Sequence, residues 1–302
     1  MTNAERIKNL SVPKHPVDVV LDTDAYNEID DQFAIAYLLS CKEKLNTKAL
    51  YAAPFYNDHS KSACDGMEQS YNEIIKLLDF MNEKCEVYRG SNAFLSDEKT
   101  PIISDAARDL AERAKNYSPE NPLYVIAIGA ITNVASAILL NPEIAENCVV
   151  IWLGGHAFHY PHTAEFNMKQ DIAAARVVMG SGVPLVLLPC RGVVSSFTIS
   201  RPELEYWLKG KSDLSDYLAS HTINTAEKYA SGTAWTRCIW DVTAVAWLMN
   251  DDERFMEART EKLRLPNYDN IYEIADGPDI QYVYHIKRDF LMTDLIKRIL
   301  ER

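Results

Sequence analysis

Six short apolar segments, separated by longer stretches with helical spacing, most constrain the fold of this 302-residue chain. They are VDVVLD from residue 17, ALYAAPF from 49, EVYRG from 86, LYVIAIG from 123, CVVIWLGG from 148 and PLVLLP from 184. Near-continuous apolar strands that alternate with helices are typical of a mostly parallel sheet covered on both faces. We therefore predict an α/β fold, with a mostly parallel open sheet flanked by helices. No linker or internal repeat divides the chain, so we expect one domain spanning residues 1–302.

Polar residues mark where several helices should begin. Asp30 and Asp31 stand at the start of an amphipathic pattern, where acidic side chains complement the helix dipole. Thr132 or Asn133 is predicted to cap the helix after the fourth apolar segment, and Asp171 the helix after the fifth.

The last third of the chain has a different pattern. Residues 202–249 are predicted to be mainly helical. Residues 271–277 and 280–286 then look like a pair of strands, and residues 290–300 like a final helix.

Charge and cysteine usage exclude several classes of function. The formal net charge is −12 and no Lys/Arg cluster is present, which disfavours a nucleic-acid polymer as a partner because phosphate binding needs a basic face. No apolar stretch is long enough to span a membrane, and residues 1–16 lack the apolar run of a secretory signal. The six cysteines are widely spread, as expected of reduced thiols. We expect a cytoplasmic protein that does not bind membranes.

Polar or glycine residues follow the predicted strands at the point where each strand ends. Asp22 and Asp24 follow the first apolar segment, and Asn57 the second. Gly129 follows the fourth and Gly154–Gly155 the fifth. Because ligands of open parallel sheets bind beyond the carboxyl ends of the strands, we expect these residues to share one site.

Residues 22–31, DTDAYNEIDD, concentrate carboxylates at the end of the first strand. Several ionised carboxylates this close need a cation or a set of donors between them, and Ca²⁺ or Mg²⁺ prefers such oxygen ligands. The alternative is an acidic turn in which Asp30 and Asp31 only cap the helix and are solvated. The fusion of Asp-x-Asp to a buried strand favours the metal site. Asp241, before another apolar helix, could add a remote carboxylate, although alone it would be interpreted as an N-cap.

Glu165 and Asn167 stand two residues apart, with Phe166 between them. In extended backbone the two side chains would face the same way and could bind neighbouring hydroxyls of a sugar. An equally good interpretation is a loop that anchors the next helix.

The segment HAFHYPH places His156, His159 and His162 at intervals of three residues, which suggests a zinc site. Pro161 interrupts any helix there, and no thiolate or second histidine pair supports the site. A polar loop facing the substrate is the better interpretation.

The sequence resembles the inosine-uridine-preferring family of nucleoside hydrolases over roughly residues 17 to 250. The motifs that carry this resemblance occur in the family's order: VVLDTD...DDQFAIAYLL, AIGAITNVASAILLNP, VVIWLGGHAF, AEFNMKQDIAAARVV and IWDVTAVAWL. The resemblance implies a mostly parallel α/β fold, a tightly bound Ca²⁺ ion and calcium-dependent hydrolysis of the N-glycosidic bond of ribonucleosides. It also implies a homodimer or homotetramer with a role in nucleoside catabolism or purine salvage.

The resemblance assigns a metal ligand set to this chain. Asp24 is implied to bind Ca²⁺ and to be the base that activates the attacking water. Asp31 and Asp241 are implied to be further Ca²⁺ ligands. Ile128 falls where the family uses a main-chain carbonyl on the metal, so its apolar side chain is no objection.

The resemblance also assigns substrate contacts. Asp30, Glu165 and Asn167 are implied to bind the ribose hydroxyls. Asn57 matches an asparagine that the family places beside the attacking water. Asp22 resembles the family's first aspartate, whose expected role is to support the loop. The chemistry agrees with this set, because breaking a ribosyl C–N bond builds positive charge on the sugar and needs negative charge beside it.

The acidic loop departs from the family pattern. Residues 25–29, AYNEI, separate the two aspartate pairs and make this loop longer than the family usually has. The loop must bulge, which should bring Tyr26, Asn27 and Glu28 near the site.

Two further departures concern base and 5′-hydroxyl recognition. Trp240 stands where many members have histidine, and resembles the purine-preferring branch, in which stacking on the base favours its protonation. The loop over residues 155–165 is short and lacks the Gly-Asn that commonly helps bind the 5′-hydroxyl, a role that a histidine of HAFHYPH could take over.

We predict a one-step displacement with inversion at the sugar carbon. Two other classes remain open. A strand that ends in Asp-x-Asp also resembles the start of haloacid-dehalogenase-type phosphatases, but that interpretation leaves the Glu165 and Asp241 motifs unexplained. The altered loop and Trp240 also permit a non-catalytic protein that binds nucleosides or sugars.

Overall fold

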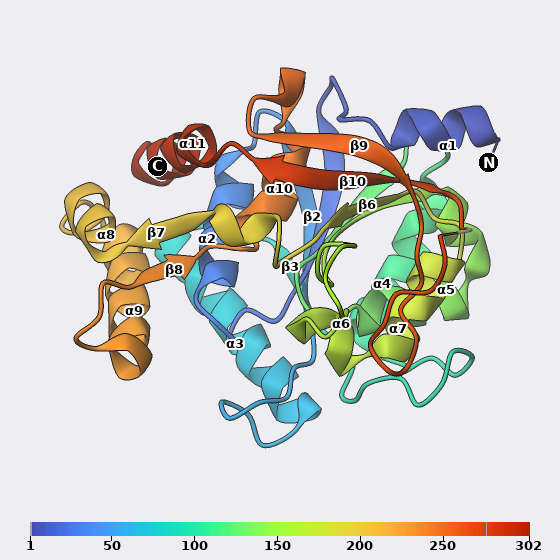
Figure 1. Cartoon of the computed structure of the whole chain (residues 1–302), viewed down its shortest axis with the longest axis horizontal. Helices are drawn as coiled ribbons and strands as arrows, with labels where there is room; N and C mark the ends of the chain where they lie inside the picture. The colour runs from blue at the N-terminus through green and yellow to red at the C-terminus, as the bar shows by residue number, and fades with distance from the viewer. Residues whose placement is uncertain (1, 276) are drawn as a thin grey trace.

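The computed structural model describes residues 2–275 and 277–302. Its centre is an eight-stranded sheet with the order β3-β2-β1-β4-β5-β6-β10-β9, parallel throughout except for the β10–β9 pair (Figure 1). The strands are β1 (Val17–Thr23), β2 (Leu45–Ala52), β3 (Glu86–Arg89), β4 (Leu123–Ala127), β5 (Cys148–Leu153), β6 (Leu185–Leu188), β9 (Met256–Lys262) and β10 (Asp279–Ile286), with β7 (Thr198–Ser200) and β8 (Thr236–Cys238) in a separate antiparallel pair. The predicted fold class is confirmed.

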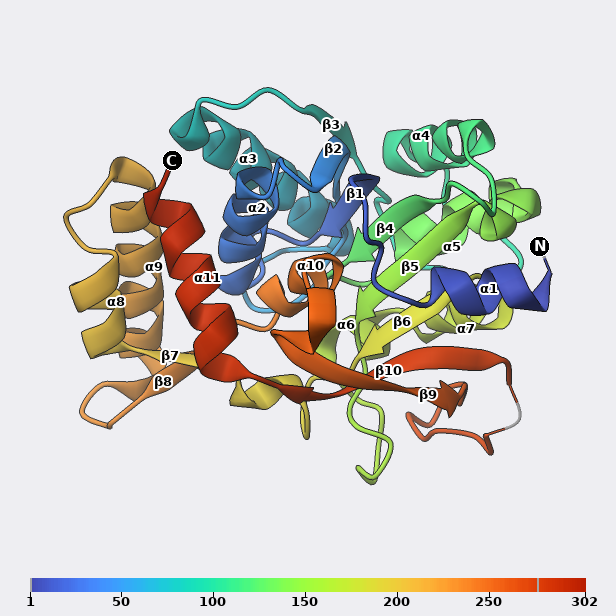
Figure 2. The same cartoon turned by 90° about the horizontal axis from the view of Figure 1, so that it is seen from above.

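Helices cover both faces of the sheet, as Figure 2 shows with α2, α3 and α11 on one side and α4, α5 and α7 on the other. The helices are α1 (Asn3–Asn9), α2 (Asp30–Ser40), α3 (Ala63–Met81), α4 (Asp105–Arg113), α5 (Thr132–Leu140), α6 (Phe166–Gln170), α7 (Ile172–Gly180), α8 (Arg201–Trp207), α9 (Asp213–Ala230), α10 (Val242–Leu248) and α11 (Arg288–Leu300). Short 3-10 helices lie at Ala114–Asn116, Pro142–Glu146, Val194–Ser196 and Asp251–Glu253. No helix among the described residues is long and apolar enough to cross a membrane.

Alternate residues of each central strand enter two different cores. Val19 and Leu21 pack in the core that contains α2, α10 and α11. Val20 packs in the core formed with α4, α5 and α7 on the opposite face. All three side chains are fully buried. Because successive strand side chains point to opposite faces, an unbroken apolar strand is what a sheet with two covered faces requires.

The prediction of a strand pair over residues 271–277 and 280–286 is wrong in its first member. The antiparallel partner of β10 is β9, which pairs Ile280 with Glu261 and Tyr282 with Arg259. Residues 271–275 form no strand, although Tyr272 makes one isolated bridge with Pro266, and residue 276 lies outside the described residues. The charged β9, MEARTEK, lies at the edge of the sheet, where only one of its seven residues is buried and its apolar pattern is weak.

The predicted caps have mixed outcomes. Asp171 caps α7, since its side chain accepts the backbone N–H of Ala174. Thr132 and Asn133 do not cap α5, which begins at Thr132 without a side-chain cap. Both point into the interior instead: Thr132 donates to Asp171, and Asn133 donates to Asp22 over 2.8 Å.

Candidate active site

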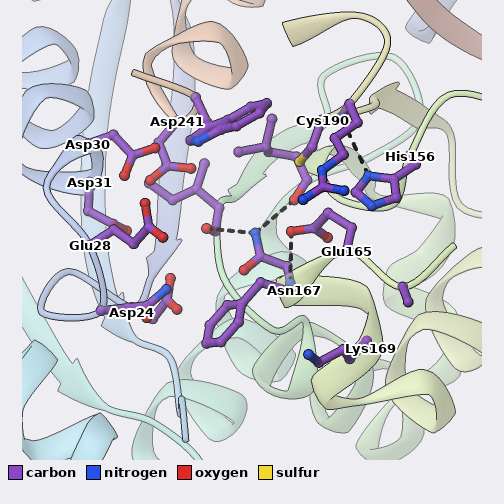
Figure 3. A pocket seen from close by; sticks show the side chains of 17 residues that line it. Asp24, Glu28, Asp30, Asp31, His156, Glu165, Asn167, Lys169, Cys190 and Asp241 are labelled. Carbon is purple, nitrogen blue, oxygen red and sulfur yellow. Dashed lines mark hydrogen bonds between the residues drawn. The ribbon is translucent and has the colours of Figure 1, made fainter. Parts of the chain in front are cut away.

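A pocket of about 310 Å³ lies beyond the carboxyl ends of β1, β4, β5 and β6. The parallel sheet explains its place, because strands of equal direction end at the same edge and their loops converge there. Of the residues predicted from the sequence, those that line it are Asp24, Asp30, Asp31, Ile128, Glu165, Asn167, Trp240 and Asp241. Figure 3 shows the carboxylates of the acidic loop facing Glu165 and Asn167.

The acidic loop is a compact turn that returns the chain from β1 into α2. The backbone N–H of Asn27 donates to the carbonyl of Asp24 over 2.7 Å. Gln32, one residue into the helix from Asp31, donates to the carbonyl of Ala25 over 2.8 Å. Asn27 and Glu28 line the pocket as expected, whereas Tyr26 lines a neighbouring hollow beside His59 and Tyr229.

Three carboxylates converge on one point of the pocket. One oxygen atom from each of Asp30, Asp31 and Asp241 lies within 4.8 Å of the others, and all three side chains are buried. Asp241 precedes α10 but makes no capping hydrogen bond. The alternative of solvated or merely capping aspartates is therefore wrong. Thr23 donates to Asp31 over 2.5 Å and orients it.

Burial raises the pKa of every carboxyl in this cluster. The pKa of Asp31 rises to about 7 through burial, although hydrogen bonds from Thr23 and with Asp241 oppose the rise. The pKa values of Asp24 and Asp241 rise through burial and then through the charges of Asp31 and Asp30, respectively. Such groups either hold protons or share a cation.

The donor set fits a hard divalent cation. Oδ2 of Asp24 is buried without a hydrogen-bond partner, and the aspartate trio supplies further oxygens with no histidine or thiolate among them. The trio contains Asp30, which the family resemblance assigned to ribose, and does not include Asp24. Among the described residues no other group of three such side chains comes as close, so the zinc hypothesis for HAFHYPH gains no support.

Ile128 and Asn167 are linked beside this cluster. The side-chain amide of Asn167 donates to the carbonyl of Ile128 over 3.1 Å and to that of Leu153 over 3.0 Å. The carbonyl of Ile128 keeps a second lone pair. Asn167 therefore ties the ends of β4 and β5 to α6.

Glu165 has the extended backbone that the sequence suggested, but Asn167 already lies in α6, so the two residues do not form one extended segment. Glu165 is the N-cap of α6, and its carboxylate accepts the backbone N–H groups of Asn167 and Met168 as well as that of Gly155. The helix-anchoring interpretation is confirmed for Glu165, whereas sugar binding by Glu165 and Asn167, which both line the pocket, stays a prediction.

Asn57 and Asp22 lie outside the pocket lining. The side-chain amide of Asn57 donates to Oδ1 of Asn27 over 2.6 Å, so Asn57 contacts the pocket through Asn27. Asp22 is fully buried under the loop, held by Asn133, and burial raises its pKa to about 7.

Sequence reasoning missed several pocket residues opposite the acidic loop. Lys169, Cys190 and Arg191 line the pocket. His156 lines it too, as expected of a histidine in the polar loop HAFHYPH. Cys190 and Arg191 follow β6 at its carboxyl end. The same rule that identified Asp24 and Gly129 would have identified them.

The comparisons with known proteins agree with this architecture. The model of the inosine-uridine preferring nucleoside hydrolase family matches residues 19–267. A non-specific ribonucleoside hydrolase of Salmonella paratyphi A is 28% identical over 258 residues, or 78% of this chain and 79% of that protein. A solved plant nucleoside hydrolase has a TM-score of 0.74 at 20% identity, covering 95% of this chain and 100% of that one.

A second solved structure, the purine-preferring ribonucleoside hydrolase from Gardnerella vaginalis, has a TM-score of 0.71 at 19% identity, covering 94% of this chain and 98% of that one. At these identities the two structures support the fold. The family model matches most of the chain and therefore shows membership of the family as well as the fold. The chain therefore belongs to the inosine-uridine preferring nucleoside hydrolase family, a family of N-glycosyl hydrolases.

Proposed function

We propose that this chain hydrolyses the N-glycosidic bond of ribonucleosides in a calcium-dependent reaction that releases free base and ribose. The observation that carries the proposal is the buried aspartate cluster beside Glu165 and Asn167 in one pocket. This pairing of a cation site with sugar-binding groups is what the reaction needs, because positive charge develops on the ribosyl ring.

Four groups would hold the ion: the carboxylates of Asp24, Asp31 and Asp241, and the carbonyl of Ile128. Ca²⁺ suits this set because it accepts carboxylate and carbonyl oxygens in irregular geometry. When bound, it supplies positive charge that acidifies water and polarises hydroxyl groups at the site. The orphan oxygen of Asp24 and the raised pKa values of the cluster support this assignment.

Residues of the chain then transfer the proton and orient the substrate. Asp24 accepts a proton from water while the water oxygen bonds to C1′. The C1′–N bond breaks and its electron pair leaves with the base, which takes up a proton from solvent, and Asp24 afterwards returns its proton to solvent. Asp30, Glu165 and Asn167 hold the ribose hydroxyls and orient C1′. Attack opposite the leaving base inverts C1′ in one step.

Two further residues assist. Asn57 acts as a positioning residue through Asn27, whose side chain it holds. Trp240 is half-buried, lines the pocket next to Asp241, and provides an aromatic face for the base. We propose a preference for purines on this ground, because the larger ring gains more from stacking.

The test is base release from inosine, adenosine, guanosine, uridine and cytidine, measured after chelation and again with Ca²⁺ restored. Release that depends on Ca²⁺ and falls by orders of magnitude in Asp24→Asn is the expected result. Asp269→Asn, at an exposed loop position, serves as the matched control. Binding of nucleosides without any release would instead identify a binding protein. Phosphate release from phosphoesters without base release would identify a phosphatase.

The base preference has its own test. Trp240→Ala should lower kcat/KM for purine nucleosides about tenfold relative to pyrimidine nucleosides, since base stacking contributes ~1–3 kcal/mol. Trp207→Ala, on the exposed surface of α8, is the control. Equal losses for purines and pyrimidines would remove Trp240 as a determinant of base preference.

We also propose a cytoplasmic location and assembly as a homodimer or homotetramer. All six cysteines are free, which supports a reducing compartment. Light scattering of the purified chain tests the assembly, and a monomer at working concentration would contradict it.

A further inference from the structure

The pocket has two walls of opposite character. Figure 3 shows Asp24, Glu28, Asp30, Asp31 and Asp241 together on one side. His156 and Cys190 lie on the other side, with Lys169 below them. Arg191 follows Cys190 in the chain and lines the same pocket. The reaction described above needs the acidic wall and leaves the basic wall unexplained.

Arg191 and Lys169 are the two cationic side chains of this wall. In the part of the chain that the structure describes, neither the guanidinium of Arg191 nor the ammonium of Lys169 makes a hydrogen bond or ion pair. Only the backbone of Arg191 is engaged, with His156 and Ala157. Arg176 on α7 shows the contrast, because it pairs with Glu98 over 2.7 Å and with Glu273 over 3.1 Å. Both residues are exposed, and two cations without a protein partner that line one pocket can attract an anion.

His156 adds a neutral donor to this wall. Its Nδ1 accepts the backbone N–H of Arg191 over 3.4 Å, so the proton of the neutral ring lies on Nε2. Burial, and then the charge of Arg191, lower the pKa of His156 to about 4. The ring therefore stays neutral at physiological pH and offers an N–H group that acts together with the guanidinium.

The position of the two walls suggests which part of a substrate meets the cations. Under the proposed function, the ribose hydroxyls lie between the aspartates and the pair Glu165 and Asn167. Glu165 accepts backbone N–H groups from Gly155, Asn167 and Met168, which offset part of its charge. A substituent on C5′, at the far end of the ring from the acidic wall, would extend toward Arg191.

We propose that the pocket takes ribosides whose 5′-oxygen carries a phosphoryl group, and that Arg191 is the residue that determines this specificity. The guanidinium suits phosphoryl oxygens because its N–H groups form paired hydrogen bonds with them. Lys169 and the Nε2–H group of His156 support the same contact. The inference rests on the proposed function and changes only the substrate. Water adds to C1′, the C1′–N bond breaks, and the products are free base and ribose 5-phosphate, with the phosphoryl group unaltered.

The first experiment compares kcat/KM for inosine 5′-monophosphate with kcat/KM for inosine in the Ca²⁺-loaded enzyme. We expect the monophosphate to be preferred, and Arg191→Gln to reduce that preference at least tenfold. Arg191→Lys, which keeps the charge but loses the paired geometry, should restore part of it. Lys211→Gln, at an exposed position between α8 and α9, is the control and should leave the preference as in the wild type. If Arg191 only balanced the charge of the acidic wall, Arg191→Gln would lower kcat/KM for both substrates by the same factor.

The second experiment measures binding of ribose 5-phosphate and of ribose by titration calorimetry, which does not depend on turnover. Tighter binding of ribose 5-phosphate that weakens in Arg191→Gln supports the anion site, even if no substrate is cleaved and the proposed function fails. Hydrolysis of inosine without hydrolysis of the monophosphate, together with equal binding of the two sugars, would overturn the inference and leave the proposed function intact.

Discussion

Thr23, the last residue of β1, donates its hydroxyl to Oδ1 of Asp31, in the first turn of α2, over 2.5 Å. This bond connects the two ends of the acidic loop. Both side chains are buried, so the hydroxyl fixes the direction of the Asp31 carboxylate where it lines the pocket. The loop residues between them are thereby held against the pocket.

Thr23→Val should weaken Ca²⁺ binding about ten- to a hundredfold, the usual cost of removing a partner of a metal ligand. Valine keeps the shape and the strand preference of threonine but removes the donor, which leaves Asp31 easier to protonate. Titration calorimetry with Ca²⁺ measures the effect. Thr260→Val, on the exposed face of β9, is the matched control. An unchanged affinity in Thr23→Val would show that Asp31 needs no orienting bond.

Gly129→Ala should lower kcat about a hundredfold with a small effect on folding, because a shift of a reacting group by about 1 Å costs that much. A Cβ at position 129 would lie 2.9 Å from Oδ1 of Asp24 and 3.1 Å from Cβ of Ala53, so Asp24 would have to move. Steady-state kinetics and thermal unfolding measure both effects. Gly180→Ala is the control, because a Cβ there meets nothing within 4 Å. Full activity in Gly129→Ala would mean that the exact position of Asp24 is unimportant.

Metal removal should destabilise the wild type, and Asp241→Asn should largely abolish that response. Without the ion, Asp30, Asp31 and Asp241 repel one another, so the amide should raise the Tm of the chelated protein. With Ca²⁺ the wild type gains about 2.7 kcal/mol at a hundredfold excess over Kd, and the variant should gain little. Thermal unfolding with chelator and with Ca²⁺ decides this, with Asp269→Asn as the exposed control. The prediction is wrong if Asp241→Asn lowers the Tm of the chelated protein.

His156 should make the protein less stable in acid. Its pKa falls from 6.5 to about 4 on folding, so the unfolded chain takes up a proton between these values that the folded chain does not. This contribution to stability is fully present above a pH of about 6.5 and is lost as the pH falls toward about 4. His156→Gln should therefore flatten the decline of the free energy of unfolding over that range.

Urea unfolding of wild type and His156→Gln at several pH values within this window measures the difference in slope. His15→Gln, at an exposed position near the N-terminus, controls for the loss of a histidine as such. Parallel curves for the wild type and His156→Gln would refute the prediction.

The β9–β10 pair and Asn57 show why sequence reasoning was incomplete. The edge strand β9 carries charged residues, so its apolar alternation is too weak to detect, and a nearer segment was chosen as the partner of β10. Asn57 follows β2 as predicted, yet the loop places it against Asn27 rather than in the pocket. Loop paths depend on contacts between distant residues, which a local pattern does not contain.

The sequence by itself determined the parallel sheet, the edge at which ligands bind and the acidic character of that edge. These follow from local rules: apolar strands imply covered faces, and equal strand direction brings Asp24, Ile128 and Glu165 to one rim. Only the tertiary structure decided that Asp30, Asp31 and Asp241 meet within 4.8 Å, and that Arg191 lines the same pocket with no side-chain partner among the described residues. Distances between elements far apart in the chain are set by how the two cores pack, and no spacing along the sequence records them.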